Sequence, residues 1–267
     1  MEYLYPILIF LGLGLGAGVL LTVASKLFFV PTDERIEEIN NELPSANCGA
    51  CGYAGCGDYA EAVVNANAPT NLCKPGGAET SEKISKIMST QALDFVEQAA
   101  FVHCNGTCEN TRLKFDFDGS PTCVAAKRFY GGFLSCSYGC LGLGDCVKSC
   151  DKNAIAIIDG VAVVDKALCE ACGKCIGACP NNLITLMPIT KHYSVRCSSQ
   201  DGGKATKTAC KKGCIGCKIC ERKCVCGAIK VENNCAVIDY EKCIGCGQCF
   251  EVCPIGAIFC CEKQSAV

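Results

Sequence analysis

A repeated array of cysteines constrains the fold of this chain more than any other feature. Eight cysteines in one segment each have a counterpart 74 residues further along. The first segment contains Cys136, Cys140, Cys146, Cys150, Cys169, Cys172, Cys175 and Cys179, and the second contains Cys210, Cys214, Cys220, Cys224, Cys243, Cys246, Cys249 and Cys253. Self-similarity at a fixed period indicates two copies of one structural unit. Each copy also contains an alternating apolar stretch with a central turn, AIAIIDGVAVVD or AIKVENNCAVID, which predicts a β-hairpin.

The composition indicates that the cysteines stabilise the fold. Cysteine accounts for 29 of the 267 residues, tryptophan is absent and only 7% of residues are aromatic. Small domains with so few large apolar side chains need disulfides or metals to be stable. A net charge of −2 excludes a strongly basic nucleic-acid-binding protein. The two histidines, His103 and His192, neighbour no recognisable nucleophile motif, which disfavours a hydrolase with a catalytic histidine.

The second copy contains two cysteine runs with the spacing C-x2-C-x2-C-x3-C. This is the spacing of bacterial ferredoxins that hold two clusters, in which three thiolates of a run bind one [4Fe–4S] cluster and the fourth binds the other. Zinc is the rival metal, but it prefers separated C-x2-C pairs. We therefore expect one cluster on Cys214, Cys217, Cys220 and Cys253, and another on Cys224, Cys243, Cys246 and Cys249.

The first copy departs from this pattern in one half. The run over residues 169–179 has the full spacing, but in the other run Leu143 stands where the second copy has Cys217. We expect Cys136 to supply the missing ligand from one turn earlier. The predicted clusters are then held by Cys136, Cys140, Cys146 and Cys179, and by Cys150, Cys169, Cys172 and Cys175. A three-iron cluster, or none, at the first of these sites is the alternative.

A third motif, CGACGYAGC, lies nearer the N-terminus and supplies Cys48, Cys51 and Cys56, with Cys73 further along. These four thiols can wrap one [4Fe–4S] cluster because the interspersed glycines let the backbone approach the sulfurs closely, although zinc would accept the same spacing. Nine cysteines remain: Cys104, Cys108, Cys123, Cys197, Cys210, Cys226, Cys235, Cys260 and Cys261. The candidate ligands of a sixth cluster are Cys104, Cys123, Cys197 and Cys210, with Cys108 as a substitute. Free or buried thiols are the alternative, so the sequence predicts five clusters and allows a sixth.

The N-terminal segment predicts a membrane anchor. Residues from Tyr3 to Ser25 form a run of 23 without charge, and a helix rising ~1.5 Å per residue spans the ~30 Å hydrocarbon core at that length. A cleaved signal sequence is the rival interpretation, but no Lys or Arg precedes the run and the run exceeds the apolar region of a signal. Lys26 and Arg35 follow it, so the positive-inside rule places the remaining chain on the cytoplasmic side of the cell membrane, where thiols stay reduced.

The expected fold class is α+β, with a single N-terminal transmembrane helix, a small four-cysteine iron–sulfur domain and two tandem ferredoxin-like domains. The expected domains are 1–30 for the membrane helix, 31–90 for the four-cysteine domain with a juxtamembrane helix and a linker, 91–133 for a connecting segment with extra candidate ligands, 134–190 for the first ferredoxin-like domain, and 191–267 for the second with a basic lead-in.

Local patterns predict the elements between the cysteine motifs. Residues 32–43, TDERIEEINNEL, predict an amphipathic helix that Pro44 ends. The polar segment 76–90, which begins with two glycines, predicts a linker with some helix, and such a linker would allow the four-cysteine domain to swing. Residues 91–102 predict a helix, and FDFDGSP at 115–121 predicts a strand and a turn.

Residues 191–223 form a basic segment. They contain nine Lys or Arg and two acidic residues, a net charge of +7, which leaves −9 for the rest of the chain because the total is −2. Such a segment could steer an acidic electron donor to the second copy, whereas a solvated loop between the copies is the alternative interpretation. Few aromatic residues are interleaved, which disfavours nucleic acid as the partner.

Several of these motifs together resemble a known family. CGACGYAGCGDYAEAV behind a membrane helix, then VHCNGT, GCLGLGDC and the paired ferredoxin runs, resemble the B component of the Rnf complex. The family is a membrane-bound ferredoxin:NAD+ oxidoreductase that couples electron flow to Na+ or H+ translocation. The resemblance implies an electron-transfer subunit that receives electrons from reduced ferredoxin and passes them through [4Fe–4S] clusters, held by the cysteines assigned above, to other membrane and peripheral subunits. The chain departs from shorter relatives in having two ferredoxin units instead of one.

No site for nucleotide chemistry is visible in the sequence, because no GxGxxG follows a predicted strand and no flavin-attachment pattern occurs. NAD+ reduction, flavins and ion translocation are therefore expected on other subunits, and no catalytic residue is expected here. Two other functions compete: a membrane polyferredoxin that reduces a redox-sensing regulator, and a scaffold stapled by zinc. Co-purification with an NAD-binding subunit would argue against the first, and acid-labile sulfide would argue against the second.

Overall fold

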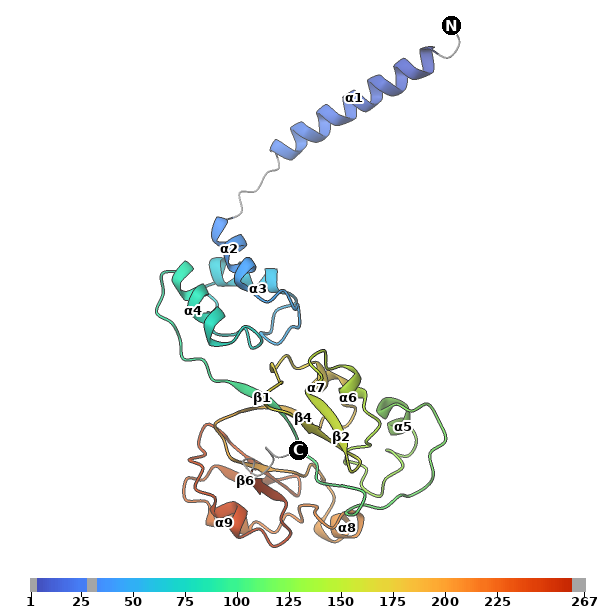
Figure 1. Ribbon diagram of the computed structural model, residues 1–267, viewed down its shortest axis with the longest axis vertical. Helices are drawn as coiled ribbons and strands as arrows, with labels where there is room; N and C mark the ends of the chain where they lie inside the picture. The colour runs from blue at the N-terminus through green and yellow to red at the C-terminus, as the bar shows by residue number, and fades with distance from the viewer. Residues whose placement is uncertain (1–3, 28–32, 261–267) are drawn as a thin grey trace.

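The computed structural model describes residues 4–27 and 33–260. In chain order these residues form a long helix, a unit of three helices, and two smaller units of short strands and helices, in agreement with the expected α+β class (Figure 1). The long helix α1 (Leu4–Leu27) projects away from the rest of the protein, and its stretch Ile9–Lys26 is long and apolar enough to cross a membrane. The expected start of the next helix at Thr32 lies outside the described residues.

The helical unit consists of α2 (Glu34–Glu42), α3 (Cys56–Asn65) and α4 (Gly77–Ile87). The Asp33 carboxylate caps α2, because it accepts the backbone N–H of Arg35 at 3.0 Å. Ile39 and Leu43 are buried together with Tyr59 of α3, as the amphipathic pattern of this segment requires. The predicted juxtamembrane helix is therefore confirmed as an integral part of this unit.

The segment at 76–90 forms a packed helix instead of the predicted linker. Gly76 is the N-cap of α4, and Ile84 is completely buried in the core that α4 shares with α2 and α3. Ser85 is buried beside it and shares a hydrogen bond of 2.7 Å with the Thr70 hydroxyl. The linker prediction is wrong because the buried face of α4 consists partly of small hydroxyl residues, which resemble a polar linker in the sequence.

Residues 91–102 do not form the predicted helix. Residues 90–97 have no regular structure and connect the helical unit to strand β1 (Gln98–Val102), which pairs antiparallel with the distant β4 (Ile184–Pro188). Pairing with a distant segment overrides the local helix preference. The strand predicted at 115–121 is also absent from the described chain, and the nearest pairing there is an isolated bridge before that segment.

Each cysteine-rich copy contains the predicted hairpin. In the first copy β2 (Ile155–Ile158) pairs with β3 (Val161–Val164), and in the second β6 (Ile229–Glu232) pairs with β7 (Cys235–Ile238). Four short helices obey the same offset of 74 residues, namely α6 (Asp145–Lys148), α7 (Lys174–Ala178), α9 (Ile219–Lys223) and α10 (Gln248–Glu251). The period of the sequence is thus also the period of the structure.

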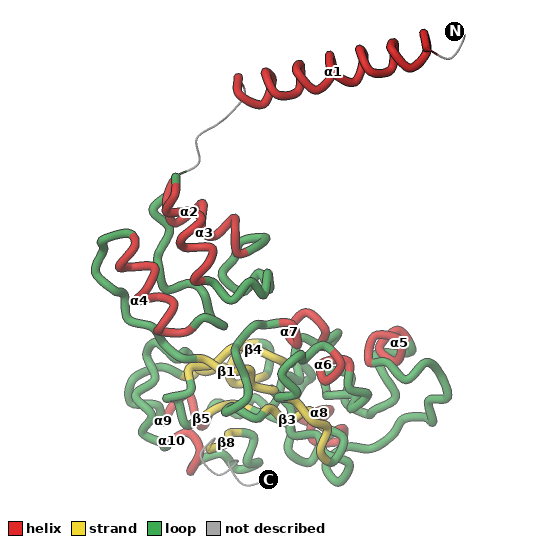
Figure 2. The backbone as a smooth tube through the Cα atoms, turned by 45° about the horizontal axis from the view of Figure 1, so that its top comes forward, coloured by secondary structure: helices red, strands yellow, loops and turns green. Residues whose placement is uncertain are grey.

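A second two-stranded sheet closes each copy, and its first strand comes from upstream of the cysteine runs. β1 pairs with β4, and β5 (Tyr193–Val195) pairs with β8 (Ile258–Cys260); Figure 2 shows these strands gathered on one side of the helical unit. Val102 lies opposite Ile184, and Val195 lies opposite Ile258. Positions 102 and 195 are therefore equivalent, with an offset of 93 residues. Loops of unequal length, containing α5 (Cys123–Arg128) and α8 (Gly203–Ala209), conceal this part of the repeat.

The packing of α4 gives a testable prediction. Replacing the buried Ile84 with alanine removes methyl and methylene groups from the core of the helical unit, which typically costs about 2–5 kcal/mol. We expect Ile84→Ala to reduce the protection of α2 and α3 amides in hydrogen-exchange mass spectrometry of the full chain. The exposed neighbour Glu82→Ala is the matched control and should leave protection unchanged. Equal protection in both variants would mean that α4 is a dispensable linker.

Candidate metal centres

The described cysteines are all unpaired, and most of them gather in groups of four. Five such groups line cavities: site 2 (Cys214, Cys217, Cys220, Cys253), site 3 (Cys104, Cys136, Cys197, Cys210), site 4 (Cys123, Cys140, Cys146, Cys179), site 5 (Cys150, Cys169, Cys172, Cys175) and site 6 (Cys48, Cys51, Cys56, Cys73). The remaining group, site 1, consists of Cys224, Cys243, Cys246 and Cys249. At site 1, three of the cysteines pack in the core of the second copy and Cys246 is exposed. Sites 1, 2, 5 and 6 have the compositions expected from the sequence.

Site 4 differs from the expectation, because Cys123 and not Cys136 lies beside Cys140. Cys123 is the first residue of α5, whose N-terminus is capped by the Thr122 hydroxyl accepting a backbone N–H. The next residue of α5 donates its N–H to the Asp145 carboxylate at 3.1 Å, which holds the start of α5 against α6. A thiol that lies outside the ferredoxin run thus occupies the corner that Leu143 leaves open.

Cys136 lies instead in site 3, where the sequence predicts Cys123. The assignments of these two cysteines are therefore wrong, and exchanging them gives the arrangement of the structure. The reason is the loop that contains α5: it brings a distant thiol into the first copy, and spacing along the chain carries no trace of this approach. The only signal in the sequence is a cysteine at a helix start, directly after the capping residue Thr122.

Site 3 is built from two equivalent pairs of cysteines, one pair from each copy. Cys136 and Cys210 are related by the offset of 74 residues, and Cys104 and Cys197 are related by the offset of 93 residues found for the upstream strands. The N–H of Cys140 donates to the Cys104 sulfur at 3.3 Å, and the equivalent N–H of Cys214 donates to the Cys197 sulfur at 3.2 Å. The site therefore lies where the two copies meet, in the position of a pseudo-two-fold axis.

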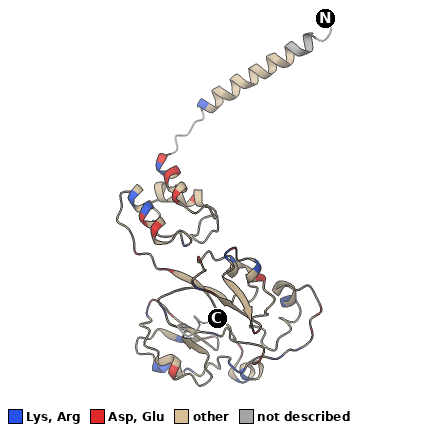
Figure 3. Cartoon of the chain, viewed as in Figure 1, with Lys and Arg blue, Asp and Glu red and all other residues tan. Residues whose placement is uncertain are grey.

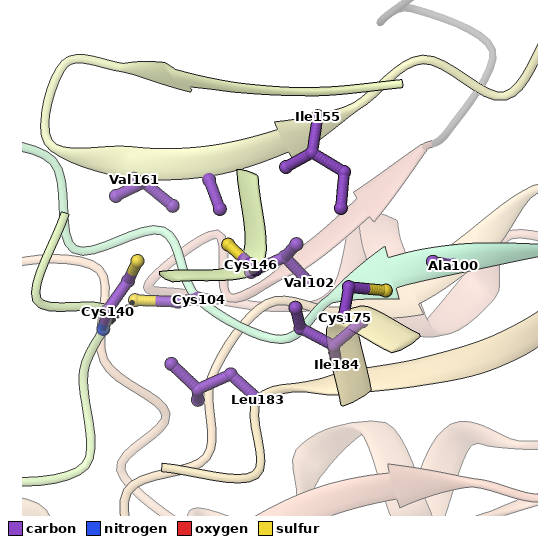
Figure 4. Packing of buried hydrophobic residues seen from close by; sticks show 11 residues of the cluster. Ala100, Val102, Cys104, Cys140, Cys146, Ile155, Val161, Cys175, Leu183 and Ile184 are labelled. Atoms are coloured by element: carbon purple, nitrogen blue, oxygen red, sulfur yellow. Dashed lines mark hydrogen bonds between the residues drawn. The ribbon is translucent and has the colours of Figure 1, made fainter. Parts of the chain in front are cut away.

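The first copy shows how the thiols contribute to the hydrophobic core. Figure 4 shows Cys104 beside Cys140 and Cys146 between the hairpin and strand β1, with aliphatic side chains around them. Cys104, Cys140 and Cys146 are each buried. The sulfurs occupy positions that larger apolar side chains fill in ordinary small domains, so the core is complete only around the cysteine-lined cavities.

His103 joins the two copies next to site 3. Its Nδ1 lies 2.8 Å from the backbone oxygen of Val195 and its Nε2 lies 2.7 Å from the Thr185 hydroxyl oxygen. Burial lowers the pKa of His103, which favours the neutral ring. A backbone oxygen can only accept, so Nδ1 carries the proton and Nε2 accepts from Thr185. The histidine thus has a structural role and is no catalytic group.

Backbone N–H groups are directed at sulfur atoms throughout the two copies. Four further donations, at 3.3 to 3.5 Å, run from Ala100 to Cys169, from Ala154 to Cys150, from Leu183 to Cys179 and from Ala257 to Cys253. Hydrogen bonds of this kind stabilise the negative charge of a thiolate and tune the potential of an iron–sulfur cluster. The backbone is therefore arranged to receive metal-bound thiolates.

The donor set fits a cluster of several irons better than a single ion. Burial raises the pKa of Cys104 and of Cys146 to about 12, so without a metal these thiols are protonated at neutral pH. Metal coordination removes the proton and resolves the unfavourable burial of charge. Within residues 4–27 and 33–260, no three His, Cys, Asp or Glu side chains converge as a single bound ion requires. Cages of four separated thiols fit [4Fe–4S] clusters and disfavour zinc.

Site 6 of the helical unit approaches site 5 of the first copy. The cavity of site 5 is lined by Cys48 and by Pro44 and Pro75 of the helical unit, in addition to its own four cysteines. Figures 1 and 2 show the helical unit lying against the α7 side of the first copy. The two sites thus share one boundary.

One glycine of the site 4 loop yields a prediction. Gly142 has φ +69°, and a Cβ atom there would lie 2.7 Å from the backbone oxygen of Gly160 in the hairpin turn. We expect Gly142→Ala to cost about 1–3 kcal/mol and to lower the midpoint of thermal unfolding. Gly57→Ala in α3 is the control, because its Cβ would have no atom within 4 Å. Equal midpoints for the two variants would contradict the close packing of the loop on the hairpin.

Comparison with known protein families agrees with these sites. A family described as an Fe-S cluster domain matches residues 43–75, which include all of site 6. A 4Fe-4S binding domain family matches residues 162–185 and 236–259, one match in each copy. Both matches support iron–sulfur clusters as the cofactors of this chain.

Similar proteins extend the likeness to most of the chain. The B component of the ion-translocating oxidoreductase complex of Methanosarcina acetivorans is 42% identical over 86% of this chain and 88% of its own length. The B component of the Na(+)-translocating ferredoxin:NAD(+) oxidoreductase complex of Acetobacterium woodii is 40% identical over 86% of this chain and 69% of its own length. The B component of the proton-translocating ferredoxin:NAD(+) oxidoreductase complex of Clostridium ljungdahlii is 39% identical over 85% of this chain and 81% of its own length. Identity of this degree over this length shows that the chain belongs to the family of B components of ion-translocating (Rnf) oxidoreductase complexes.

Proposed function

We propose that this chain is the iron–sulfur electron-transfer subunit of a membrane ion-translocating ferredoxin:NAD+ oxidoreductase, and that it holds six [4Fe–4S] clusters. The observation that carries the proposal is the unbroken succession of four-cysteine sites from the second copy to the helical unit behind α1. The names of the relatives favour this function over a polyferredoxin that reduces a regulator. NAD+ reduction and ion translocation are assigned to other subunits.

The order of the sites follows from contacts between their cysteines. Site 2 adjoins site 3, because the Cys214 N–H donates to Cys197, and site 3 adjoins site 4, because the Cys140 N–H donates to Cys104. Sites 4 and 5 share the core of the first copy, as sites 1 and 2 share that of the second. Cys48 connects site 5 to site 6. The path therefore runs in numerical order from site 1 to site 6.

Each site has the same division of labour between cofactor and protein. A bound [4Fe–4S] cluster supplies one-electron redox chemistry. The chain supplies the thiolates, directs backbone N–H groups at their sulfurs, and surrounds them with aliphatic side chains that exclude water. These three contributions set the potential of each site, and none of them requires a proton donor or a nucleophile.

The second copy is the end at which electrons arrive. Cys217 and Cys246 are exposed, and they stand beside the exposed apolar residues Ile244 (68% exposed) and Val225 (67% exposed). Lys and Arg are prominent on the nearby helix α9 (Figure 3). A basic rim around an apolar patch above a shallow redox centre suits an acidic electron donor such as reduced ferredoxin.

The helical unit is the end at which electrons leave. It follows α1 directly in the chain and carries site 6, so it lies closest to the membrane subunits that would accept electrons. Lys26 at the end of α1 and Arg35 beyond it place this unit on the cytoplasmic side by the positive-inside rule.

The exchanged roles of Cys123 and Cys136 can be tested by counting clusters. Cys123→Ala should remove one cluster's share of iron and sulfide from site 4, and adding Cys140→Ala should remove no more. Combining Cys123→Ala with Cys136→Ala should remove two shares, because these cysteines serve different sites. Cys108→Ala is the control, since Cys108 is exposed and lines none of the sites. A single lost share in the Cys136→Ala and Cys140→Ala double variant would return Cys136 to site 4.

The proposed docking of the donor can be tested by charge reversal. Lys218→Glu with Arg222→Glu reverses two exposed charges beside site 2. We expect the rate of electron transfer from reduced ferredoxin at low salt to fall about tenfold or more, and the difference to shrink at high salt. Lys86→Glu on α4 is the control and should keep the original rate. An equal loss for both variants would argue against docking at the second copy.

A further inference from the structure

Cys235 is a buried thiol that lines none of the six sites. It is 7% exposed and begins strand β7, directly after the turn of the second hairpin. Its thiol donates to the backbone oxygen of Cys197 at 3.2 Å and also contacts the thiols of Cys197 and Cys214. Because Cys197 belongs to site 3 and Cys214 to site 2, Cys235 lies between ligands of two neighbouring sites.

The first copy provides the natural comparison. The position equivalent to Cys235 is Val161, which is 2% exposed and begins strand β3. The backbone around the two positions is alike, because Cys140 donates to Cys104 just as Cys214 donates to Cys197. The difference between the copies at this point is therefore a thiol donor in one and two methyl groups in the other.

Cys235 acts as a donor and remains protonated. Its hydrogen bonds lower the pKa of Cys197 and of Cys214, and the same hydrogen bonds, together with burial, raise the pKa of Cys235 itself. A thiol carries one weak donor hydrogen, which here is directed among atoms of two ligand residues. Hydrogen bonds to ligand sulfur favour the more negative, reduced state of an iron–sulfur cluster and so raise its reduction potential.

We propose that Cys235 is a positioning residue that raises the reduction potentials of sites 2 and 3 above the value that the symmetric fold would give them. The inference rests on the proposed function, since it requires clusters on Cys197 and Cys214. Val161 gives site 4 no such donor. The thiol therefore breaks the equivalence between sites 2 and 4 that the repeat would otherwise impose, and it holds an arriving electron near the middle of the path.

The test replaces each residue by its counterpart in the intact chain. Cys235→Val, Cys235→Ser and Val161→Cys are made in the full-length protein with its clusters, and redox titrations are followed by electron paramagnetic resonance. We expect Cys235→Val to lower the equilibrium constant for reduction of the affected centres about tenfold, or about 59 mV for one electron. Cys235→Ser, which retains a hydroxyl donor, should restore the original titration. Val161→Cys should raise the potential of a different centre.

Iron and sulfide analysis separates the outcomes. Unchanged cluster content with a lowered potential in Cys235→Val supports the proposal. Loss of one cluster's share of iron and sulfide in that variant would show that Cys235 is itself a ligand and would overturn it. Superimposable titrations of Cys235→Val and the unaltered protein would also overturn it. Failure of the proposed function is distinct, because the unaltered protein would then contain no [4Fe–4S] clusters at all.

Discussion

Backbone N–H groups directed at buried sulfur atoms are the interaction on which this structure depends. The two ferredoxin-like units have short strands, short helices and few aromatic residues, so their cores contain mostly thiols and small aliphatic side chains. Burial alone makes a thiolate such as Cys104 unfavourable, and the N–H groups of Cys140 and Gly106 offset only part of that cost. Metal coordination supplies the remainder, so that folding and cofactor binding stabilise the same arrangement.

The same interaction also determines where the sites lie relative to one another. The peptide group that directs its N–H at Cys197 belongs to Cys214, a residue of the next site, and the peptide group of Cys140 has the same relation to Cys104. Each hydrogen bond that stabilises one site thus fixes the position of its neighbour. Close spacing of redox centres along the path is a direct result of how each centre is stabilised.

Sequence reasoning succeeds where the relevant residues are close together along the chain. The ferredoxin runs, the two hairpins and the α2 segment follow from local spacing and alternation, and the structure places them as expected. It fails where a distant segment completes a unit: β1 pairs with β4, Cys123 enters site 4 from α5, and Ile84 packs α4 into the helical unit. In these cases the deciding contact is tertiary, and loops of unequal length conceal the equivalence of Cys104 and Cys197.

Site 3 has a consequence for the evolution of such chains. Each copy offers the same two thiols to the other, which is the isologous relation found at the interface of a symmetric homodimer. A chain with a single copy would have only half of this cage and could complete it only by pairing with a second molecule. Tandem duplication within one gene converts that association into an intramolecular contact, so the central redox centre no longer depends on protein concentration.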